Sequence, residues 1–241
     1  MSTGTGALTR TFADRREAGR ALAVALEHDR GPGLVVVGLA RGGVETAAEV
    51  ARILDAPLDV VAVRKVAHPW QPEYGIGAVT PGDGVYVRGP DGLTPDQVAA
   101  AVDEAKVKAA VLDARLHDDH PPLDLHGQTV VVVDDGVATG ATMIAALRWA
   151  RAGGAARVVA AVPVGAAAGL QLLGGEADAV VCLQAPSLFF SVGASYDDFA
   201  PLGDDAVVRL LDENRRAHVV HRSGVRVLPD FGTFESAHSH E

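Results

Sequence analysis

The sequence predicts an α/β fold in which a parallel sheet is flanked by helices on both faces. Short apolar runs alternate with amphipathic stretches along the chain, which is the pattern of repeated strand–helix–strand units. The apolar runs are continuous, as in "LVVVGL" from Leu34 and "TVVVV" from Thr129, and strands covered on both faces have this composition. At 241 residues, 48% of them hydrophobic, the chain is long enough for one such domain.

The first part of the chain predicts one strand–helix–strand unit. Apolar residues recur at helical spacing over residues 12–28, and the turn "GPG" from Gly31 ends this helix. A buried strand follows from Leu34, and the stretch over residues 40–54 becomes helical after its glycines. A second buried strand is expected over residues 57–66, so the two strands should be parallel neighbours.

The middle of the chain changes character. Prolines alternate with glycines from His68 to Gly92, and "IGAV" and "VYVR" predict a small hairpin across "TPGDG". A long helix is then expected from Thr94 to Leu116, because threonine is a preferred N-cap and Pro95 suits the first helical position.

The last part of the chain continues the alternation. Strands are expected over residues 129–133, 157–164 and 177–184, with helices over 140–154 and 166–173 between them. The stretch from Ala185 to Gly203 concentrates aromatic residues in a chain that has only 5% of them. A final helix is expected over residues 204–217.

Charge and cysteine content limit the class of function. A formal net charge of -10 argues against a general nucleic-acid binder, which needs a basic face. Cys182 is the single cysteine, so neither a disulfide within the chain nor a cysteine metal cluster is possible. The first residues lack a signal-peptide core and no apolar run reaches transmembrane length, so we expect a cytoplasmic protein without a membrane partner.

Two adjacent carboxylates, Asp134 and Asp135, follow the strand at 129–133. Ligands of open parallel sheets bind beyond the carboxyl ends of the strands, so this pair lies where a site is expected. Like charges repel, and they persist where a metal or donors such as sugar hydroxyls favour both. The glycines of "GVATGAT", its two threonine hydroxyls and the following helix start can bind an anion. The pattern predicts a ribose 5-phosphate, with the acids on the sugar and the loop on its phosphate.

The stretch "VVVVDDGVATGATM", residues 130–143, resembles the phosphoribosyl pyrophosphate (PRPP) binding motif of type I phosphoribosyltransferases. The order of "GLARGG", "VRK", "PEYGIGAV", this motif, "AVPV" and "FFSVGASYDDF" is most similar to a bacterial group of predicted phosphoribosyltransferases of undefined substrate. The resemblance spans residues 12–216 and implies a Rossmann-like parallel sheet with a flexible lid loop and a small hood. It implies PRPP contacts from Asp134, Asp135, Gly136, Val137, Ala138, Thr139, Gly140, Ala141 and Thr142.

The resemblance also implies a pyrophosphate site after the first strand. The family's loop there offers backbone amides and a basic residue, and by analogy we expect a cis peptide bond between Ala40 and Arg41. Arg64 and Lys65, at the end of the second expected strand, are further candidates, and strand alternation turns only one of them toward the ligand. The implied pyrophosphate-binding residues are Ala40, Arg41, Gly42, Gly43, Arg64 and Lys65.

The segment over residues 66–88 stands where the family carries a mobile loop that closes over PRPP, and its glycines and prolines suit hinges. Within it, Glu73 of "EYG" resembles the lid acid or base of adenine phosphoribosyltransferases. Glu73 is therefore a candidate catalytic residue beside Asp134 and Asp135. Hypoxanthine-guanine enzymes use an aspartate inside the PRPP loop as base, and Ala138 takes that position here.

The aromatic stretch resembles the purine-type hood of hypoxanthine-guanine enzymes. By that resemblance, Phe190 would stack on a base, the backbone of Val192 would read its edge and Asp197 would face pyrophosphate. Of Phe189 and Phe190 one is expected to be a core residue, since neighbours in an extended segment face opposite ways. The implied cofactor is Mg²⁺, held largely by substrate phosphates and water, with Asp135 and Asp197 as its protein contacts.

These observations predict one phosphoribosyltransferase domain over residues 1–217, with a lid or insert at about 66–116 and a hood at about 185–202, before a tail at 218–241. The expected reaction moves the ribose 5-phosphate of PRPP to a nitrogenous base, with a purine as one candidate, and releases pyrophosphate. A non-catalytic PRPP sensor of the same fold is the alternative, and hydrolysis or phosphorolysis at the same sugar site stays open.

The oligomeric state and the tail carry weaker signals. The family usually forms homodimers, and either the helix from Thr94 or the tail would supply the interface. The tail holds two histidine pairs without nearby cysteines, which we expect to be solvated rather than metal-binding. They are His218 with His221 and His238 with His240.

Overall fold

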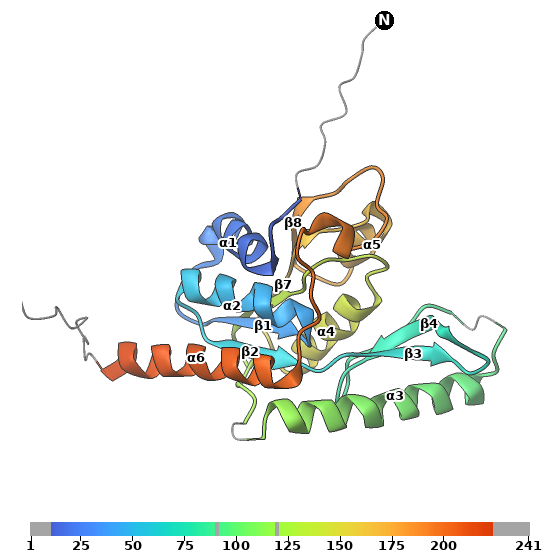
Figure 1. Cartoon of the computed structure of the whole chain (residues 1–241). Coiled ribbons are helices and arrows are strands. Elements are labelled where there is room, and N and C mark those ends of the chain that lie inside the picture. The colour runs from blue at the N-terminus through green and yellow to red at the C-terminus, as the bar shows by residue number, and fades with distance from the viewer. Residues whose placement is uncertain (1–10, 90–91, 119–120, 224–241) are drawn as a thin grey trace, which may run out of the picture.

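The computed structural model of the chain describes residues 11–89, 92–118 and 121–223. It contains a five-stranded parallel sheet between two layers of helices and a separate three-stranded antiparallel sheet that a long helix covers (Figure 1). The predicted α/β fold with a flanked parallel sheet is confirmed.

The parallel sheet has the strand order β2-β1-β6-β7-β8, and all neighbouring pairs are parallel. From β1 the chain moves outward to β2, whereas from β6 it moves the other way to β7 and β8. The direction therefore reverses between β1 and β6, which makes the carboxyl ends of these two strands the expected place for a ligand. The strands are β1 (Leu34–Leu39), β2 (Leu58–Val61), β6 (Thr129–Val133), β7 (Arg157–Val164) and β8 (Ala179–Gln184).

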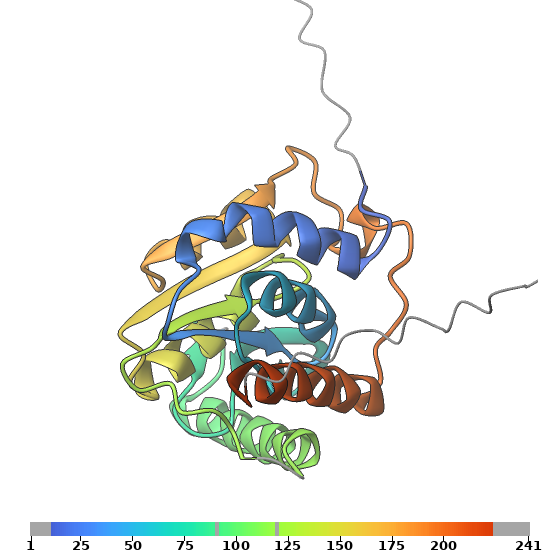
Figure 2. The same ribbon diagram turned by 90° about the vertical axis from the view of Figure 1, so that its left-hand side faces the viewer.

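Helices cover both faces of this sheet, as the two views in Figures 1 and 2 show. Val36 and Val131 are fully buried toward one helical layer, and Val37 and Val132 are fully buried toward the other. Each such valine stabilises the fold by about 1.5–3 kcal/mol relative to exposure. The first layer holds α1 (Arg15–Ala25), α2 (Gly42–Leu54) and α6 (Asp204–Ser223), and the second holds α4 (Ala141–Ala152) and α5 (Ala167–Leu173).

The first helix is shorter than the expected 12–28. Asp14 is its N-cap, and the carboxylate accepts a hydrogen bond from the backbone N–H of Glu17 at 2.7 Å. Phe12 instead forms a β-bridge with Tyr196, and its N–H donates to the carbonyl of Ser195 at 2.8 Å. The other end closes in a short 3₁₀ helix, η1 (Glu27–Asp29).

The single strand expected over residues 57–66 is wrong. β2 ends at Val61, whose carbonyl accepts from Ala40 N–H at 3.0 Å, just past the end of β1. With no further partner in the parallel sheet, the chain leaves it, and Arg64 pairs with Val79 in the antiparallel sheet. Ala62 and Val63, between the two strands, are also apolar and buried, so the composition of the segment does not reveal this break.

The antiparallel sheet consists of β3 (Arg64–His68), β4 (Gln71–Val79) and β5 (Val85–Val87), so the hairpin expected across "TPGDG" is confirmed. The segment over residues 66–88, for which the resemblance implies a mobile loop, thus lies mostly in three strands. They pack on α3 (Pro95–Leu116) through a cluster centred on Val66, Ile76 and Ala105. As expected, Thr94 caps α3, with a reciprocal capping box to Gln97. We call β3, β4, β5 and α3 the lid unit.

The last helix extends beyond the expected 217. α6 continues to Ser223, so the expected boundary between domain and tail falls inside a helix. His218 belongs to α6, whereas His238 and His240 lie outside the described residues. Of the helices in the described ranges, none combines the length and the apolar character needed to cross a membrane.

Candidate active site at the carboxyl ends of β1 and β6

Two loops meet at the carboxyl ends of β1 and β6, where the strand order reverses; we call this place the switch point of the parallel sheet. One follows β1 and leads into α2, and the other follows β6 and leads into α4. A Cβ added at Gly43 would lie 2.8 Å from Oδ1 of Asp134 and 2.8 Å from the carbonyl oxygen of Val133. This spacing excludes any side chain at Gly43 unless the backbone at Val133 and Asp134 moves. The expected pyrophosphate loop and the expected ribose acids are therefore packed directly against each other.

The two adjacent acids are held differently. Oδ1 of Asp134 accepts a hydrogen bond from the N–H of Asp135 at 2.9 Å, which turns that carboxylate back over its own strand end. Oδ2 of Asp135 accepts from Nε of Arg15 at 2.8 Å. Asp135 is thus already neutralised by a side chain of this chain, whereas Asp134 has no ion-pair partner among the contacts of the described residues.

Arg15 is the residue of the site that sequence reasoning missed. It is only 6% exposed although it carries a charge. Its Nη1 donates to the carbonyl of Ala200 at 2.8 Å, and its guanidinium carbon lies 3.8 Å from the centroid of the Phe199 ring. Arg15 therefore ties the first helix, the acids and the hood together. Its position in α1, 120 residues before Asp135, gave no local signal.

The electrostatic state of the acids follows from this packing. Burial raises the pKa of Asp134 well above the ordinary range of an aspartate, and the negative charge of Asp135 raises it further. Burial also raises the pKa of Asp135, while its hydrogen bond with Arg15 opposes that rise. A carboxylate whose pKa is raised in this way favours ligands that donate hydrogen bonds to it or bring positive charge near it, because both stabilise its charged form.

The loop after the acids is anchored so that its tip points outward. Val137 N–H donates to Val164 O at 2.9 Å, and Ala166 N–H donates to Val137 O at 2.8 Å. Gly140 has φ 82° and caps α4, a conformation that favours glycine. Ala138 and Thr139 are exposed at the tip, and Ala141 and Thr142 open the helix half-buried. Free amides at a helix start next to two hydroxyls form a ready anion site.

The structure has the cis peptide bond expected between Ala40 and Arg41, so that prediction is confirmed. The side chain of Arg41 is 44% exposed and its Nε lies 2.7 Å from Oδ1 of Asp204 at the start of α6. Arg64 and Lys65 open β3 rather than ending β2, with Arg64 half-buried and Lys65 exposed. Arg64 follows the carboxyl end of β2 by three residues and Lys65 by four, so both remain near the same edge of the parallel sheet.

Glu73 lies in the outer, exposed part of β4. Its neighbour Tyr74 contacts the ring of His68 at a centroid distance of 6.1 Å and the guanidinium of Arg88 at 5.2 Å. The candidate lid acid thus lies on the hairpin of β3 and β4 in the lid unit (Figure 1).

The hood over residues 185–202 is mostly irregular and rests on the loop over residues 134–140, which we call the acid loop. The hydroxyl of Tyr196 donates to the carbonyl of Asp135 at 2.5 Å. A Cβ added at Gly136 would lie 2.5 Å from the side chain of Val192, so hood and acid loop are in close contact. Phe189 packs in the core cluster of Phe12 and Tyr196, which confirms that one member of the Phe189–Phe190 pair is a core residue.

Phe190 is 86% exposed, and Asp197 is exposed with its Oδ1 accepting from the hydroxyl of Thr11 at 2.7 Å. The hood therefore presents a free aromatic face beside the acid loop. Tyr196 and Phe199, which sequence reasoning noticed only as part of an aromatic cluster, hold the hood in place: their rings stack with centroids 5.1 Å apart.

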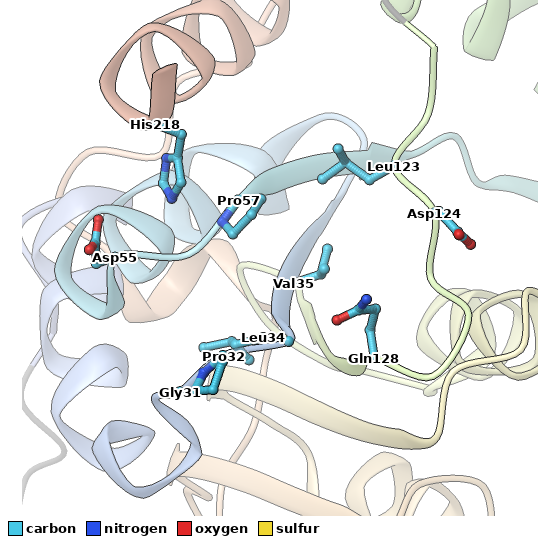
Figure 3. A pocket seen from close by; sticks show the side chains of 11 residues that line it. Gly31, Pro32, Leu34, Val35, Asp55, Pro57, Leu123, Asp124, Gln128 and His218 are labelled. Carbon is cyan, nitrogen blue, oxygen red and sulfur yellow. The ribbon is translucent and has the colours of Figure 1, made fainter. Parts of the chain in front are cut away.

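Two cavities bear on where the substrate site lies. A cavity of about 260 Å³ lies between the loop tip at Ala138 and Thr139, the strands of the lid unit at Ile76 and Arg88, and α5 at Leu172. A larger one of about 630 Å³ opens at the amino ends of the parallel strands, among Leu34, Pro57, Leu123 and His218 (Figure 3). The larger cavity is at the end of the sheet away from the acids, so volume alone does not identify the site.

The comparisons with known proteins agree with this geometry. The family model for the phosphoribosyl transferase domain matches residues 7–198. Proteins from two strains of Mycobacterium tuberculosis, named "Putative phosphoribosyl transferase MT0597" and "Putative phosphoribosyl transferase Rv0571c", are each 45% identical over 212 residues, which is 86% of this chain and 47% of theirs. The chain therefore spans about half the length of the curated relatives it matches.

Among solved structures, that of the protein TT1426 from Thermus thermophilus is similar with 40% sequence identity and a TM-score of 0.73, covering 84% of this chain and 98% of the other. The domain model covers well over half of the chain. The chain belongs to the phosphoribosyl transferase domain family.

Proposed function

We propose that the protein is a Mg²⁺-dependent phosphoribosyltransferase that moves the ribose 5-phosphate of PRPP to a nitrogen of a free base and releases pyrophosphate. The observation that carries the proposal is the packing at the switch point: a half-buried acid without an ion-pair contact, a glycine loop directly against it and an anion-binding helix start beyond it. Few ligands other than a sugar phosphate need these three features together.

Each group has a role in this proposal. Asp134 accepts the ribose hydroxyls, because its raised pKa reflects a carboxylate in need of donors. The loop from Ala138 to Thr142 binds the 5-phosphate through backbone amides and threonine hydroxyls. The amides of the loop from Ala40 to Gly43 bind pyrophosphate. Asp135 has two roles: it contacts the substrate, and its ion pair with Arg15 holds the acid loop in position.

The reaction breaks the bond between C1 of the ribose and the pyrophosphate oxygen and forms a bond from C1 to the base nitrogen. The electron pair of the broken bond leaves with pyrophosphate, and the base nitrogen loses its proton. Positive charge develops on the sugar in between, and a buried carboxylate beside the ring stabilises it. Fixed contacts to both ends of PRPP supply the orientation, which is the larger part of such catalysis.

Mg²⁺ fits the donors at the site. In the described ranges no three His, Cys, Asp or Glu side chains form a group that could hold a metal ion by themselves. Mg²⁺ commonly uses one or two carboxylates together with substrate phosphates and water, and Asp135 and Asp197 are the candidates. When bound, the ion neutralises the charge that pyrophosphate gains on leaving.

The acceptor is proposed to lie between the hood and the lid unit. The exposed ring of Phe190 offers a stacking face, and Val192, whose side chain lies against Gly136, would offer its backbone to the edge of the base. Closure of the β3–β4 hairpin would bring Glu73 to the base nitrogen as general acid or base. A purine suits the size of such a stacking surface.

The test follows pyrophosphate release from PRPP and Mg²⁺ with a panel of purine and pyrimidine bases. Release with one base and none with the others supports the proposal and names the acceptor. PRPP binding without release for any base favours a PRPP sensor and contradicts the transferase. Glu73→Gln should lower kcat and alter its pH profile without changing PRPP affinity; an unchanged kcat removes Glu73 from the mechanism.

A further inference from the structure

The side chain of Arg41 is held by a carboxylate of the protein itself. Its Nε lies 2.7 Å from Oδ1 of Asp204, the first residue of α6. Arg41 follows β1 in the loop proposed to bind pyrophosphate, and a Cβ added to the next residue, Gly42, would overlap Oδ2 of Asp135. Arg41 therefore stands at the edge of the proposed active site, and the positive charge that it would offer to a pyrophosphate oxygen already faces an anion.

This contact is a charge attraction without a directed hydrogen bond. Oδ1 of Asp204 is buried, yet it accepts no hydrogen bond within the described part of the chain, although Nε of Arg41 is only 2.7 Å away. The N–H of Arg41 is therefore not aimed at this oxygen. The side chain of Arg41 is also 44% exposed, and ion pairs with such exposure change an equilibrium by at most about fivefold. A pyrophosphate, which carries more negative charge than one carboxylate, is able to replace Asp204.

Only the side chain of Arg41 has to move in this exchange. The backbone of Arg41 is fixed at the start of α2, where its carbonyl accepts from the N–H of Val44 at 3.1 Å. Asp204 is fixed as well, because Val207, one turn further along α6, is fully buried in the core cluster that α6 shares with α2. The exchange between the carboxylate and a ligand thus needs only the rotation of one half-exposed side chain.

Asp204 keeps a positive partner when Arg41 leaves. Its Oδ2 lies 3.4 Å from Nη1 of Arg115, because the start of α6 and the end of α3 lie side by side (Figure 1). The carboxylate is thus shared by two arginines, one from the loop after β1 and one from the lid unit. Displacement of Arg41 leaves a paired acid rather than an isolated one, which lowers the cost of the exchange.

We propose that Asp204 is a latch on Arg41: it holds the guanidinium until the pyrophosphate group of PRPP, or free pyrophosphate, takes its place. The inference rests on the proposed function, because it needs a pyrophosphate at the loop from Ala40 to Gly43. The latch lowers the affinity of this loop for pyrophosphate, since binding must first break the contact with Asp204. It also favours the release of pyrophosphate after the transfer, because the carboxylate replaces the leaving anion.

The test is titration calorimetry of inorganic pyrophosphate with Mg²⁺ against the full chain and its variants. Asp204→Asn should bind pyrophosphate about fivefold more tightly than the wild type, because Arg41 is then free. The matched control is Asp205→Asn, which removes the same charge from the neighbouring, exposed residue of α6 and should change the affinity by less than about twofold. Asp204→Ser also removes the carboxylate and suits a helix start, so it should tighten binding equally even if the asparagine variant folds poorly.

A second substitution separates the latch from a general loss of negative charge. In an Arg41→Met background, Asp204→Asn should tighten pyrophosphate binding no more than Asp205→Asn does, because no guanidinium remains to be released. A gain of about fivefold that persists without Arg41 overturns the latch.

The sign of the change separates the latch from the other roles of Asp204. If the wild type binds pyrophosphate and Asp204→Asn binds it equally or more weakly, Asp204 orients Arg41 or plays no part, and the latch is overturned while the proposed function stands. If neither the wild type nor any variant binds pyrophosphate, the loop from Ala40 to Gly43 is not a pyrophosphate site, and the proposed function falls together with the latch.

Discussion

The ion pair between Arg15 and Asp135 gives the sharpest test of how the site is built. Arg15→Met keeps most of the side-chain volume and removes the charge. The substitution deletes the 2.8 Å contact to Oδ2 of Asp135, the 2.8 Å hydrogen bond to Ala200 O and the contact with the Phe199 ring. It leaves the carboxylate of Asp135, whose side chain is 14% exposed, without its positive partner.

The expected cost is large because the pair is buried. Removing one partner of a buried ion pair costs about 3–5 kcal/mol. For a chain of this size each kcal/mol lowers the melting temperature by about 2–4 °C, so Arg15→Met should melt roughly 10 °C lower. The neighbouring Arg16 is a matched control: its side chain is 54% exposed in its pair with Glu45, and Arg16→Met should cost about 1 kcal/mol or less.

Urea unfolding of the two variants measures this difference directly. The double variant Arg15→Met with Asp135→Asn should recover more than half of the loss, because the unpaired buried charge is gone. An Arg15→Met variant as stable as Arg16→Met would refute the reasoning. So would a double variant no more stable than Arg15→Met alone, since the loss would then come from packing.

Two further changes test the contact of the loops and the attachment of α3. Gly43→Ala should lower PRPP affinity at least tenfold, because the new methyl group displaces the backbone at Val133 and Asp134 and with it the carboxylate; unchanged affinity in calorimetry would contradict that contact. Burial opposes protonation of His117, but hydrogen bonds to Asp113 and Asp59 outweigh it and raise its pKa to about 10. The stabilisation is therefore complete below the unfolded value of about 6.5 and is lost as pH rises through about 10. His117→Gln should cost about 3 kcal/mol in urea unfolding at pH 6 and far less at pH 11; an equal loss at both would rule out a charged His117.

The strands and the acid loop could be predicted because their signals are local. β1, β6 and β7 are continuous valine-rich runs. Such a run can be recognised as a strand buried on both faces without knowing which segments pack against it. The acid loop, likewise, is a contiguous set of residues whose chemistry follows from their order. Its resemblance to a known motif and its position at the strand end gave the same answer.

The rest depended on contacts between distant segments. Nothing around Arg15 in the sequence distinguishes it from Arg16, yet folding buries one and exposes the other. The break after Val61 is set by where β1 ends, because a strand without a partner leaves the sheet. The ordered lid unit depends on α3 covering β3 and β4, and periodicity within either segment does not reveal that contact.

The measurement that tests the central claim most directly is titration calorimetry of PRPP with Mg²⁺ against the wild type, Asp134→Asn and Asp83→Asn. Asp83 is exposed in the turn between β4 and β5, next to Trp149 and Leu125, away from the acid loop. If Asp134 holds the ribose, its substitution removes about 3 kcal/mol of charge-assisted hydrogen bonding, a loss of about 100-fold in affinity. Wild-type binding retained by Asp83→Asn and lost by Asp134→Asn is the predicted result. PRPP binding of equal strength in all three, or in none, would contradict the assignment of the sugar site.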